Sequence, residues 1–135
     1  MAYNKLTIYT DGGARGNPGQ AGTGVVIYDE NKKVVQKLAK YLGKQTNNQA
    51  EYQALILGLR WAKSLRAVEV RCCLDSELVV KQMRGEYKVK NPNVKPLYEK
   101  AVALTGSFAA VSFSHVSREK NKEADKLVNE AIDSR

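Results

Sequence analysis

Thr10-Asp-Gly-Gly-Ala-Arg-Gly-Asn-Pro-Gly19 is the stretch of sequence that decides the fold. It follows the run Lys5-Leu-Thr-Ile-Tyr9, whose β-branched and aromatic side chains predict a strand. The glycines predict a loop in which the backbone approaches a ligand closely, because glycine has no Cβ and tolerates positive φ. We therefore expect Asp11 to end a strand beside such a loop. The alternative is a tight connection in which Asp11 merely caps a turn.

Outward from this stretch, the pattern of the chain predicts a mixed α/β fold. Further strands are expected at residues 24–28, 34–41, 68–74 and 109–114, and helices at 50–65, 76–83, 97–104 and 119–134. Thr46-Asn-Asn-Gln49 has the form of a capping box and opens the long helix. A helix between two strands implies a right-handed crossover with parallel pairing. This order of elements predicts a mixed sheet with helices on its faces.

Length and composition are those of a globular protein. The 135 residues predict a single domain spanning residues 1–135, and the hydrophobic content of 43% is typical of soluble proteins. No apolar run approaches the ~18 residues that a membrane span needs, and the chain shows no signal-peptide pattern. We therefore expect a cytoplasmic monomer without membrane contact. Cys72 and Cys73 are adjacent and lack metal-ligand spacing, so we interpret them as unpaired core thiols.

The net charge of +8 is unevenly distributed. Residues 31–50 contain five lysines and no acidic side chain, and residues 81–100 contain six basic and two acidic side chains. Clustered positive charge favours a polyanionic partner, because phosphate contacts supply most of the non-specific affinity for nucleic acids. The alternative is a solvated, lysine-rich surface.

Four carboxylates occupy places where an α/β sheet gathers its ligands. Asp11 and Asp75 each follow a predicted strand, Glu51 lies in the first turn of the long helix, and Asp125 lies in the closing helix. Carboxylates that converge repel one another unless a cation neutralises them, and oxygen ligands suit Mg²⁺ or Mn²⁺. Two such ions ~4 Å apart can stabilise both oxygens of a phosphoryl displacement. Taken singly, Glu51 and Asp75 could equally be partners of a helix dipole.

Four blocks of the sequence resemble, in order, the signature blocks of type 1 ribonuclease H. They are Thr10–Gly19 followed by Gly22-x-Gly24, Thr46–Tyr52, Leu74-Asp-Ser76, and His115-x₅-Asn121-x₃-Asp125. The resemblance spans nearly the whole chain. It implies the ribonuclease H-like fold, a five-stranded mixed sheet of order 3-2-1-4-5 with strand 2 antiparallel and helices on both faces. It also implies endonucleolytic hydrolysis of the RNA strand of RNA/DNA hybrids by two metal ions, leaving 5′-phosphate and 3′-hydroxyl ends.

The resemblance assigns roles to individual side chains. Asp11, Glu51, Asp75 and Asp125 match four catalytic carboxylates that bind two Mg²⁺ ions, for which Mn²⁺ can substitute, and His115 matches a catalytic histidine on a mobile loop. The positions that match substrate contacts are Gly12, Gly13, Asn17, Thr46, Asn48, Gln49 and Ser76. The glycine backbone would approach ribose 2′-hydroxyls, and Thr46 would contact a DNA phosphate. Ser76 is also a candidate helix cap.

The region between residues 83 and 96 departs from many bacterial members of the family. Those members carry a longer basic handle rich in Lys and Trp, whereas this segment is short and contains no tryptophan. We therefore expect a compact form whose affinity for substrate is modest and sensitive to salt. Two alternatives are a nuclease of the same fold that acts on duplex RNA or branched DNA, and a non-catalytic nucleic-acid-binding module. The four intact carboxylates argue against the second.

Overall fold

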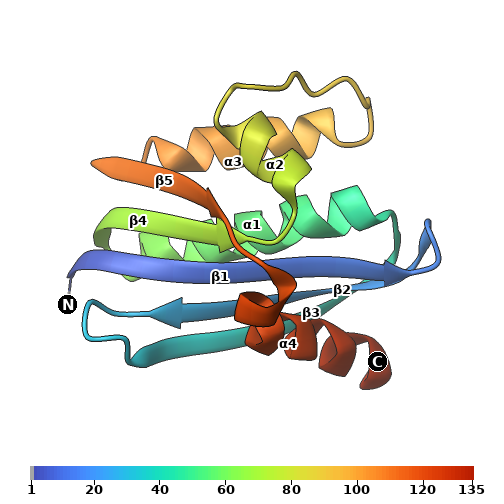
Figure 1. Cartoon of the computed structure of the whole chain (residues 1–135), viewed down its shortest axis with the longest axis horizontal. Helices are drawn as coiled ribbons and strands as arrows, with labels where there is room; N and C mark the ends of the chain where they lie inside the picture. Colours follow the sequence, from blue (N-terminus) through green and yellow to red (C-terminus); the bar gives the residue numbers. More distant parts are fainter. Residues whose placement is uncertain (1) are drawn as a thin grey trace.

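The computed structural model describes residues 2–135, which form a five-stranded sheet with helices on both faces (Figure 1). The elements are β1 (Tyr3–Arg15), β2 (Gly19–Tyr28), β3 (Val34–Gln45), α1 (Asn47–Ser64), β4 (Ala67–Leu74), α2 (Glu77–Met83), α3 (Lys95–Thr105), β5 (Ala110–His115), the 3₁₀ helix η1 (Arg118–Asn121) and α4 (Lys122–Asp133). The strand order is β3-β2-β1-β4-β5. β2 runs antiparallel to β1 and β3, whereas β4 pairs in parallel with β1 and β5. The predicted fold class is confirmed.

The glycine-rich stretch lies mostly inside a strand, so the expectation that a loop follows Asp11 was wrong. β1 continues to Arg15, and its second half pairs with β2 from Asp11 opposite Gly24 to Arg15 opposite Gln20. Antiparallel pairing with β2 supplies backbone partners that a local turn signal cannot reveal. β4, by contrast, stops at Leu74, opposite Thr10. Asp11 therefore stands where β1 loses one of its two neighbours.

Two glycines allow helices to approach the sheet closely from opposite faces. A Cβ atom on Gly12 would lie 2.1 Å from the carbonyl oxygen of Ala50, so α1 packs directly on β1 at this point. A Cβ atom on Gly24 would lie 2.0 Å from the carbonyl oxygen of Ala124 in α4. Both contacts are too short for any other residue. The glycines thus bring α1 and α4 close to Asp11, which lies between them on β1.

The main hydrophobic core lies between the sheet and α1. Its largest fully buried side chains include Leu6, Ile8, Ile27, Tyr52, Leu55, Leu59, Val70 and Leu74. Cys72 and Cys73 are buried free thiols, as expected. The capping box at the start of α1 is present, because the Thr46 hydroxyl accepts from the amide of Gln49 while the Gln49 side chain accepts from the amide of Thr46. These features fix the position of the first turn of α1, which carries Glu51.

The closing helix is shorter than its sequence pattern predicts. Residues 118–121 form the 3₁₀ helix η1, and α4 begins only at Lys122. Asn121, with φ −113° and ψ 20°, lies at the junction. His115 is the last residue of β5, so its placement on a loop was also wrong. In the part of the chain that the structure describes, no helix has the length and apolar character needed to cross a membrane.

Candidate active site

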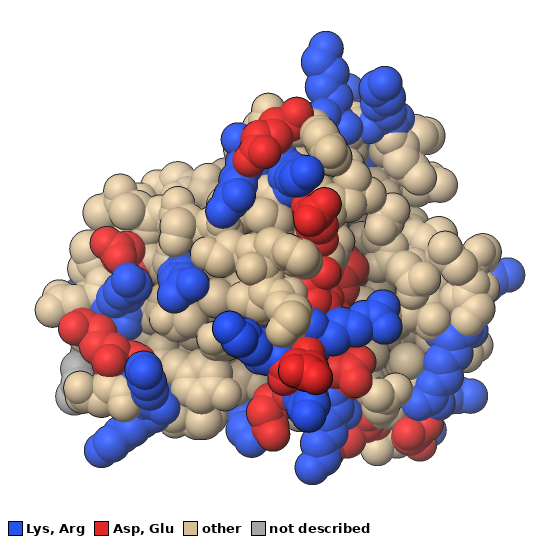
Figure 2. Space-filling view, viewed as in Figure 1, with Lys and Arg blue, Asp and Glu red and all other residues tan. Residues whose placement is uncertain are grey.

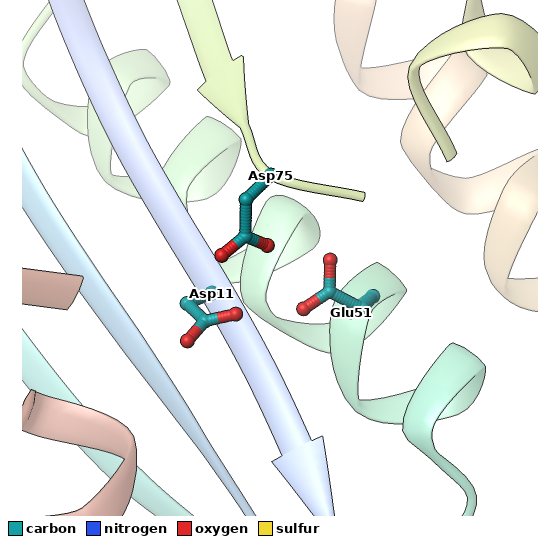
Figure 3. Close-up of side chains that lie close together, drawn as sticks. All are labelled: Asp11, Glu51 and Asp75. Atoms are coloured by element: carbon teal, nitrogen blue, oxygen red, sulfur yellow. The ribbon is translucent and has the colours of Figure 1, made fainter. Parts of the chain in front are cut away.

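Asp11, Glu51 and Asp75 come from three different elements and point toward one another (Figure 3). One oxygen from each carboxylate can be chosen so that the three oxygens lie within 4.8 Å of one another. The parallel pairing of β1 with β4 explains part of this convergence, because Thr10 lies opposite Leu74 and the next residue of each strand is an aspartate. The close approach of α1 at Gly12 supplies the third carboxylate. The structure thus brings together three of the four predicted metal ligands.

Glu51 is oriented by the backbone of β1. The amide of Gly12 donates a hydrogen bond of 2.6 Å to Oε1 of Glu51. The other carboxylate oxygen, Oε2, is buried and has no hydrogen-bond partner among residues 2–135. Leaving a buried carboxylate oxygen without a partner is unfavourable. This oxygen is therefore suited to a positively charged ligand.

The carboxyls of Asp11 and Glu51 are both harder to ionise than ordinary ones. Burial is the main cause of the raised pKa of Asp11, and the neighbouring charges of Glu51 and Asp75 raise it further. Burial also raises the pKa of Glu51, although hydrogen bonds from Asp11 and from the Gly12 amide oppose the rise. The contact between the two carboxyls raises the pKa of Asp11 and lowers that of Glu51, so Asp11 is the harder of the two to ionise.

The residues of this cluster fit a divalent cation. All three ligands are carboxylate oxygens, which are the donors that Mg²⁺ and Mn²⁺ prefer. A cation among them would offset the like-charge repulsion that raises the pKa of Asp11, and would give the buried Oε2 of Glu51 a partner. Asp11, Glu51 and Asp75 would hold the metal, and Asp125 lies next to Asp11 at the edge of the group.

Asp125 and His115 lie on the solvent side of the cluster. Asp125 is exposed in the first turns of α4, and its contact with Asp11 contributes to the raised pKa of Asp11. His115 is also exposed, and its Nε2 atom lies 3.3 Å from the carbonyl oxygen of Asp75. Its Nδ1 atom lies 3.9 Å from Oε2 of Glu77. The structure therefore places the histidine beside the loop that carries Asp75, without a hydrogen bond to any of the three clustered carboxylates among the described residues.

A cavity of about 490 Å³ opens over the cluster. Of the predicted substrate contacts, Gly12, Gly13, Asn48 and Ser76 line this cavity together with Asp11, Glu51, Asp75 and Asp125. In the view of Figure 2, acidic side chains lie along the middle of the molecular surface, with basic side chains on both sides. Ser76 is also the N-cap of α2, because its hydroxyl accepts from the amide of Val79. Both interpretations of Ser76 are compatible with its position.

The remaining predicted substrate contacts stabilise the start of α1 beside the cavity. Thr46 and Gln49 form the capping box, and the side-chain oxygen of Asn17 accepts a hydrogen bond of 3.0 Å from the amide of Asn47. The Thr46 hydroxyl accepts from Gln49, so its own hydrogen stays available for a phosphate oxygen. Asn17 links the turn after β1 to the first residue of α1. These side chains hold the start of α1, whose residues Asn47, Asn48 and Glu51 line the cavity.

Two arginines that line the cavity were missed in the sequence. Arg118 lies in η1, and its positive charge lowers the pKa of Glu51. Arg15, at the end of β1, pairs with Asp133 and donates to the side chain of Asn129, both near the end of α4. Their closeness to Asp11 and His115 in the sequence was an available signal, but only the fold shows that they face the carboxylates.

A sheet of this order, with clustered carboxylates at the end of β4, defines the class of ribonuclease H-like nucleases. The family model described as reverse transcriptase-like matches residues 9–131. The chain is 44% identical over 131 residues to "Bifunctional protein Rv2228c" of Mycobacterium tuberculosis, covering 96% of this chain but 36% of that protein. It is 38% identical over 129 residues to "Ribonuclease HI" of Halobacterium salinarum, covering 96% of this chain and 65% of that protein. The chain thus spans about a third to two thirds of these relatives.

Solved structures extend the similarity to the whole fold. RNase H1 from the halophilic archaeon Halobacterium salinarum superposes with a TM-score of 0.94 at 37% identity, covering 97% of this chain and 99% of that one. LC11-RNase H1, solved in complex with an RNA/DNA hybrid, superposes with a TM-score of 0.89 at 48% identity, covering 96% and 97%. The chain belongs to the reverse transcriptase-like family and, within it, to the type 1 ribonucleases H. This confirms the family to which the sequence resemblance assigned the chain.

Proposed function

We propose that this protein cleaves the RNA strand of RNA/DNA hybrids with the help of two Mg²⁺ ions. The observation that carries the proposal is the convergence of Asp11, Glu51 and Asp75, with one buried Glu51 oxygen unpartnered, beneath an open cavity. Bound Mg²⁺, or Mn²⁺ in its place, would activate the attacking water and stabilise the leaving oxygen. The similarity to a ribonuclease H1 solved with an RNA/DNA hybrid supports the choice of substrate.

The reaction is a hydrolysis in which a water oxygen bonds to phosphorus and the bond from phosphorus to the 3′-oxygen breaks. The products are a 5′-phosphate and a 3′-hydroxyl end. Gly12 holds Glu51 in place through its amide, and Asp11, Glu51 and Asp75 would hold the metal ions. His115, which is exposed beside the cavity, is placed to exchange protons with solvent or to ease release of the product.

Binding to the hybrid would use the rim and the walls of the cavity. The backbone at Gly12 and Gly13, together with Asn48 and Ser76, faces the space where ribose 2′-hydroxyls would lie. Thr46 offers a hydroxyl to a DNA phosphate, while Asn17 and Gln49 support it from the start of α1. Arg15 and Arg118 add positive charge to the walls. A single domain, the monomeric state and the cytoplasmic location stay predictions.

Cleavage of matched substrates tests the proposal. A labelled RNA/DNA hybrid, a duplex RNA and a duplex DNA of one sequence are incubated with the protein and Mg²⁺, and the ends of the products are mapped. We expect cleavage of the RNA strand of the hybrid, leaving 5′-phosphate ends. Asp75→Asn should abolish it, whereas Glu69→Gln, a carboxylate-to-amide change on the exposed side of β4 away from the cavity, should not.

Each other outcome has a definite meaning. Cleavage of duplex RNA or duplex DNA in preference to the hybrid would assign the protein to a different nuclease of the same fold. Binding of the hybrid without cleavage, with Mg²⁺ and Mn²⁺ both tried, would make it a non-catalytic binding module.

A further inference from the structure

Asn121 is buried at the start of α4 but does not cap that helix. Asparagine is among the preferred N-cap residues, and Asn121 occupies the N-cap position, yet its side chain makes no capping hydrogen bond. Instead, its Nδ2 atom donates a hydrogen bond of 2.9 Å to the carbonyl oxygen of Thr10 on β1. The side chain is 1% exposed. Helix capping therefore does not explain this asparagine, whereas its bond to β1 does.

This bond connects the two elements that carry Asp11 and Asp125. Thr10 directly precedes Asp11, and Asp125 follows Asn121 by four residues, one helical turn along the same face of α4. Asp125 and Asp11 line the same cavity. Pairing with β4 cannot support β1 beyond this point, because it ends at Thr10 opposite Leu74. Asn121 thus forms its hydrogen bond to β1 at the residue where the pairing of β1 with β4 ends.

Asn121 also ends the segment that follows His115. At the other end of that segment, the amide of Val116 donates a hydrogen bond of 2.9 Å to the carbonyl oxygen of Leu74. Residues 117–120 between these two attachments are all exposed. The bond to Thr10 therefore anchors the start of α4 to β1, so that movement of residues 117–120 need not displace Asp125.

From these contacts we infer that Asn121 is a positioning residue, which sets the place of Asp125 relative to Asp11 and thereby the affinity for metal. This inference rests on the proposed metal-dependent function. A residue needed for packing alone would fit better as an apolar side chain, because Oδ1 of Asn121 is buried without a partner among the described residues, which is unfavourable. The side-chain amide of Asn121 keeps this unpaired oxygen, while its nitrogen donates the hydrogen bond to β1. Side chains that orient metal ligands in this way typically change metal affinity 10–100-fold when replaced.

The test compares two replacements of Asn121 with a control on the same helix. Asn121→Ala removes the amide, and Asn121→Leu removes it while filling a similar volume. Ala131→Gly loosens α4 at a buried position outside the cavity lining, with a typical helix cost of about 1 kcal/mol. Binding of Mn²⁺ to each full-length protein is measured by calorimetry, alongside thermal unfolding and the Mg²⁺ dependence of hybrid cleavage.

We expect both Asn121 variants to bind Mn²⁺ about 10–100-fold more weakly and to need correspondingly more Mg²⁺ for half-maximal cleavage. Ala131→Gly should lower the melting temperature but keep the wild-type metal affinity. If the Asn121 variants bind metal as well as Ala131→Gly does, the inference is overturned. Failure of both variants to fold would assign Asn121 to the fold alone and also overturn it. A wild-type protein that neither binds Mn²⁺ nor cleaves the hybrid would instead refute the proposed function.

Discussion

The two sides of the candidate site differ in their exposure to solvent. Asp11 and Glu51 are 8% and 7% exposed, and burial raises the pKa of both. Asp125 and His115, on the side of α4 and β5, are exposed. The buried side is assembled by backbone contacts at Gly12 and by the pairing of β1 with β4. The exposed side is positioned by the close packing of α4 on β2 at Gly24, by the buried bond from Asn121 to Thr10 and by the short segment after His115.

This contrast implies a division of roles. Charges in a poorly solvated place interact strongly with a bound cation, whereas exposed charges are screened by water. We therefore expect the buried carboxylates to determine whether the reaction takes place, and the exposed side chains to adjust its rate. The predictions that follow test this division.

The largest effect is expected from replacing one of the three clustered carboxylates. Asp11→Asn, Glu51→Gln and Asp75→Asn should each lower kcat on the order of 10⁴-fold or more, because a metal ligand supplies several kcal/mol of transition-state stabilisation. Hybrid binding should persist in Asp11→Asn, since the change removes negative charge near a phosphate. Single-turnover cleavage and binding assays check both points. Wild-type turnover by Asp11→Asn in Mg²⁺ would show that Asp11 does not hold the metal.

Asp125→Asn should have a smaller effect, on the order of 10³-fold in kcat, because Asp125 is exposed and an amide oxygen can still ligate a metal. The loss should shrink as the Mg²⁺ concentration increases, if the variant binds metal more weakly but keeps the chemistry. Rates measured over a range of Mg²⁺ concentrations test this. A loss as complete as that of Asp75→Asn would show that Asp125 is as essential to catalysis as the three clustered carboxylates.

His115→Ala should have the smallest effect on catalysis, about 10²-fold, at the lower end of what general acid–base catalysis contributes. The imidazole lies beside the carbonyl of Asp75 and, among the described residues, forms no hydrogen bond to the three clustered carboxylates. Metal binding should be unchanged, and the loss should appear either in the pH profile or in product release. Pre-steady-state kinetics separate the two. If His115→Ala is as inactive as Asp11→Asn with intact metal binding, the histidine is essential to the chemical step.

The sequence predicted the sheet order and the three carboxylates that converge, but not how the backbone reaches them. Glycine and proline after Asp11 indicated a loop, yet β1 continues to Arg15 because β2 pairs with it, and pairing between distant residues leaves no local signal. Gly12 and Gly24 are explained by the atoms of α1 and α4 that touch them. Such contacts become visible only in three dimensions.

The residues that support the site were hidden for the same reason. Asn121 was part of a recognised block, but its bond joins positions 111 residues apart, and the helix predicted over residues 119–134 placed it inside the helix rather than before it. Arg15 and Arg118 are ordinary basic residues in the sequence, and their orientation toward the carboxylates depends on α4 and η1. Residue type, spacing and the family resemblance indicated the candidate metal ligands, whereas the supporting contacts follow from tertiary packing.

The last prediction concerns thermal stability without metal. The same substitution should change the melting temperature more on the buried side of the site than on the exposed side. The pKa of Asp11 in the folded protein is raised from its ordinary value of 3.8 to about 10. At a pH between these two pKa values, the metal-free native protein therefore binds more protons than the unfolded chain. The contribution of Asp11 to stability is therefore greatest at low pH and is lost as the pH rises through the raised pKa. Asn cannot ionise, so Asp11→Asn should melt higher than wild type in metal-free buffer, by on the order of 5 °C at pH 8 and by less at pH 5.

The exposed Asp125 provides the matched comparison, because Asp125→Asn removes the same charge where burial contributes little. Its melting temperature should change much less with pH than that of Asp11→Asn. Calorimetric scans at pH 5 and pH 8, with chelator present, measure both. Saturating Mg²⁺ should then stabilise the wild type more than Asp11→Asn, since a ligand stabilises only the state that binds it. If Asp11→Asn melts lower than wild type at pH 8 without metal, the charge of Asp11 does not destabilise the native state. The electrostatic argument for a cation at this site would then fail.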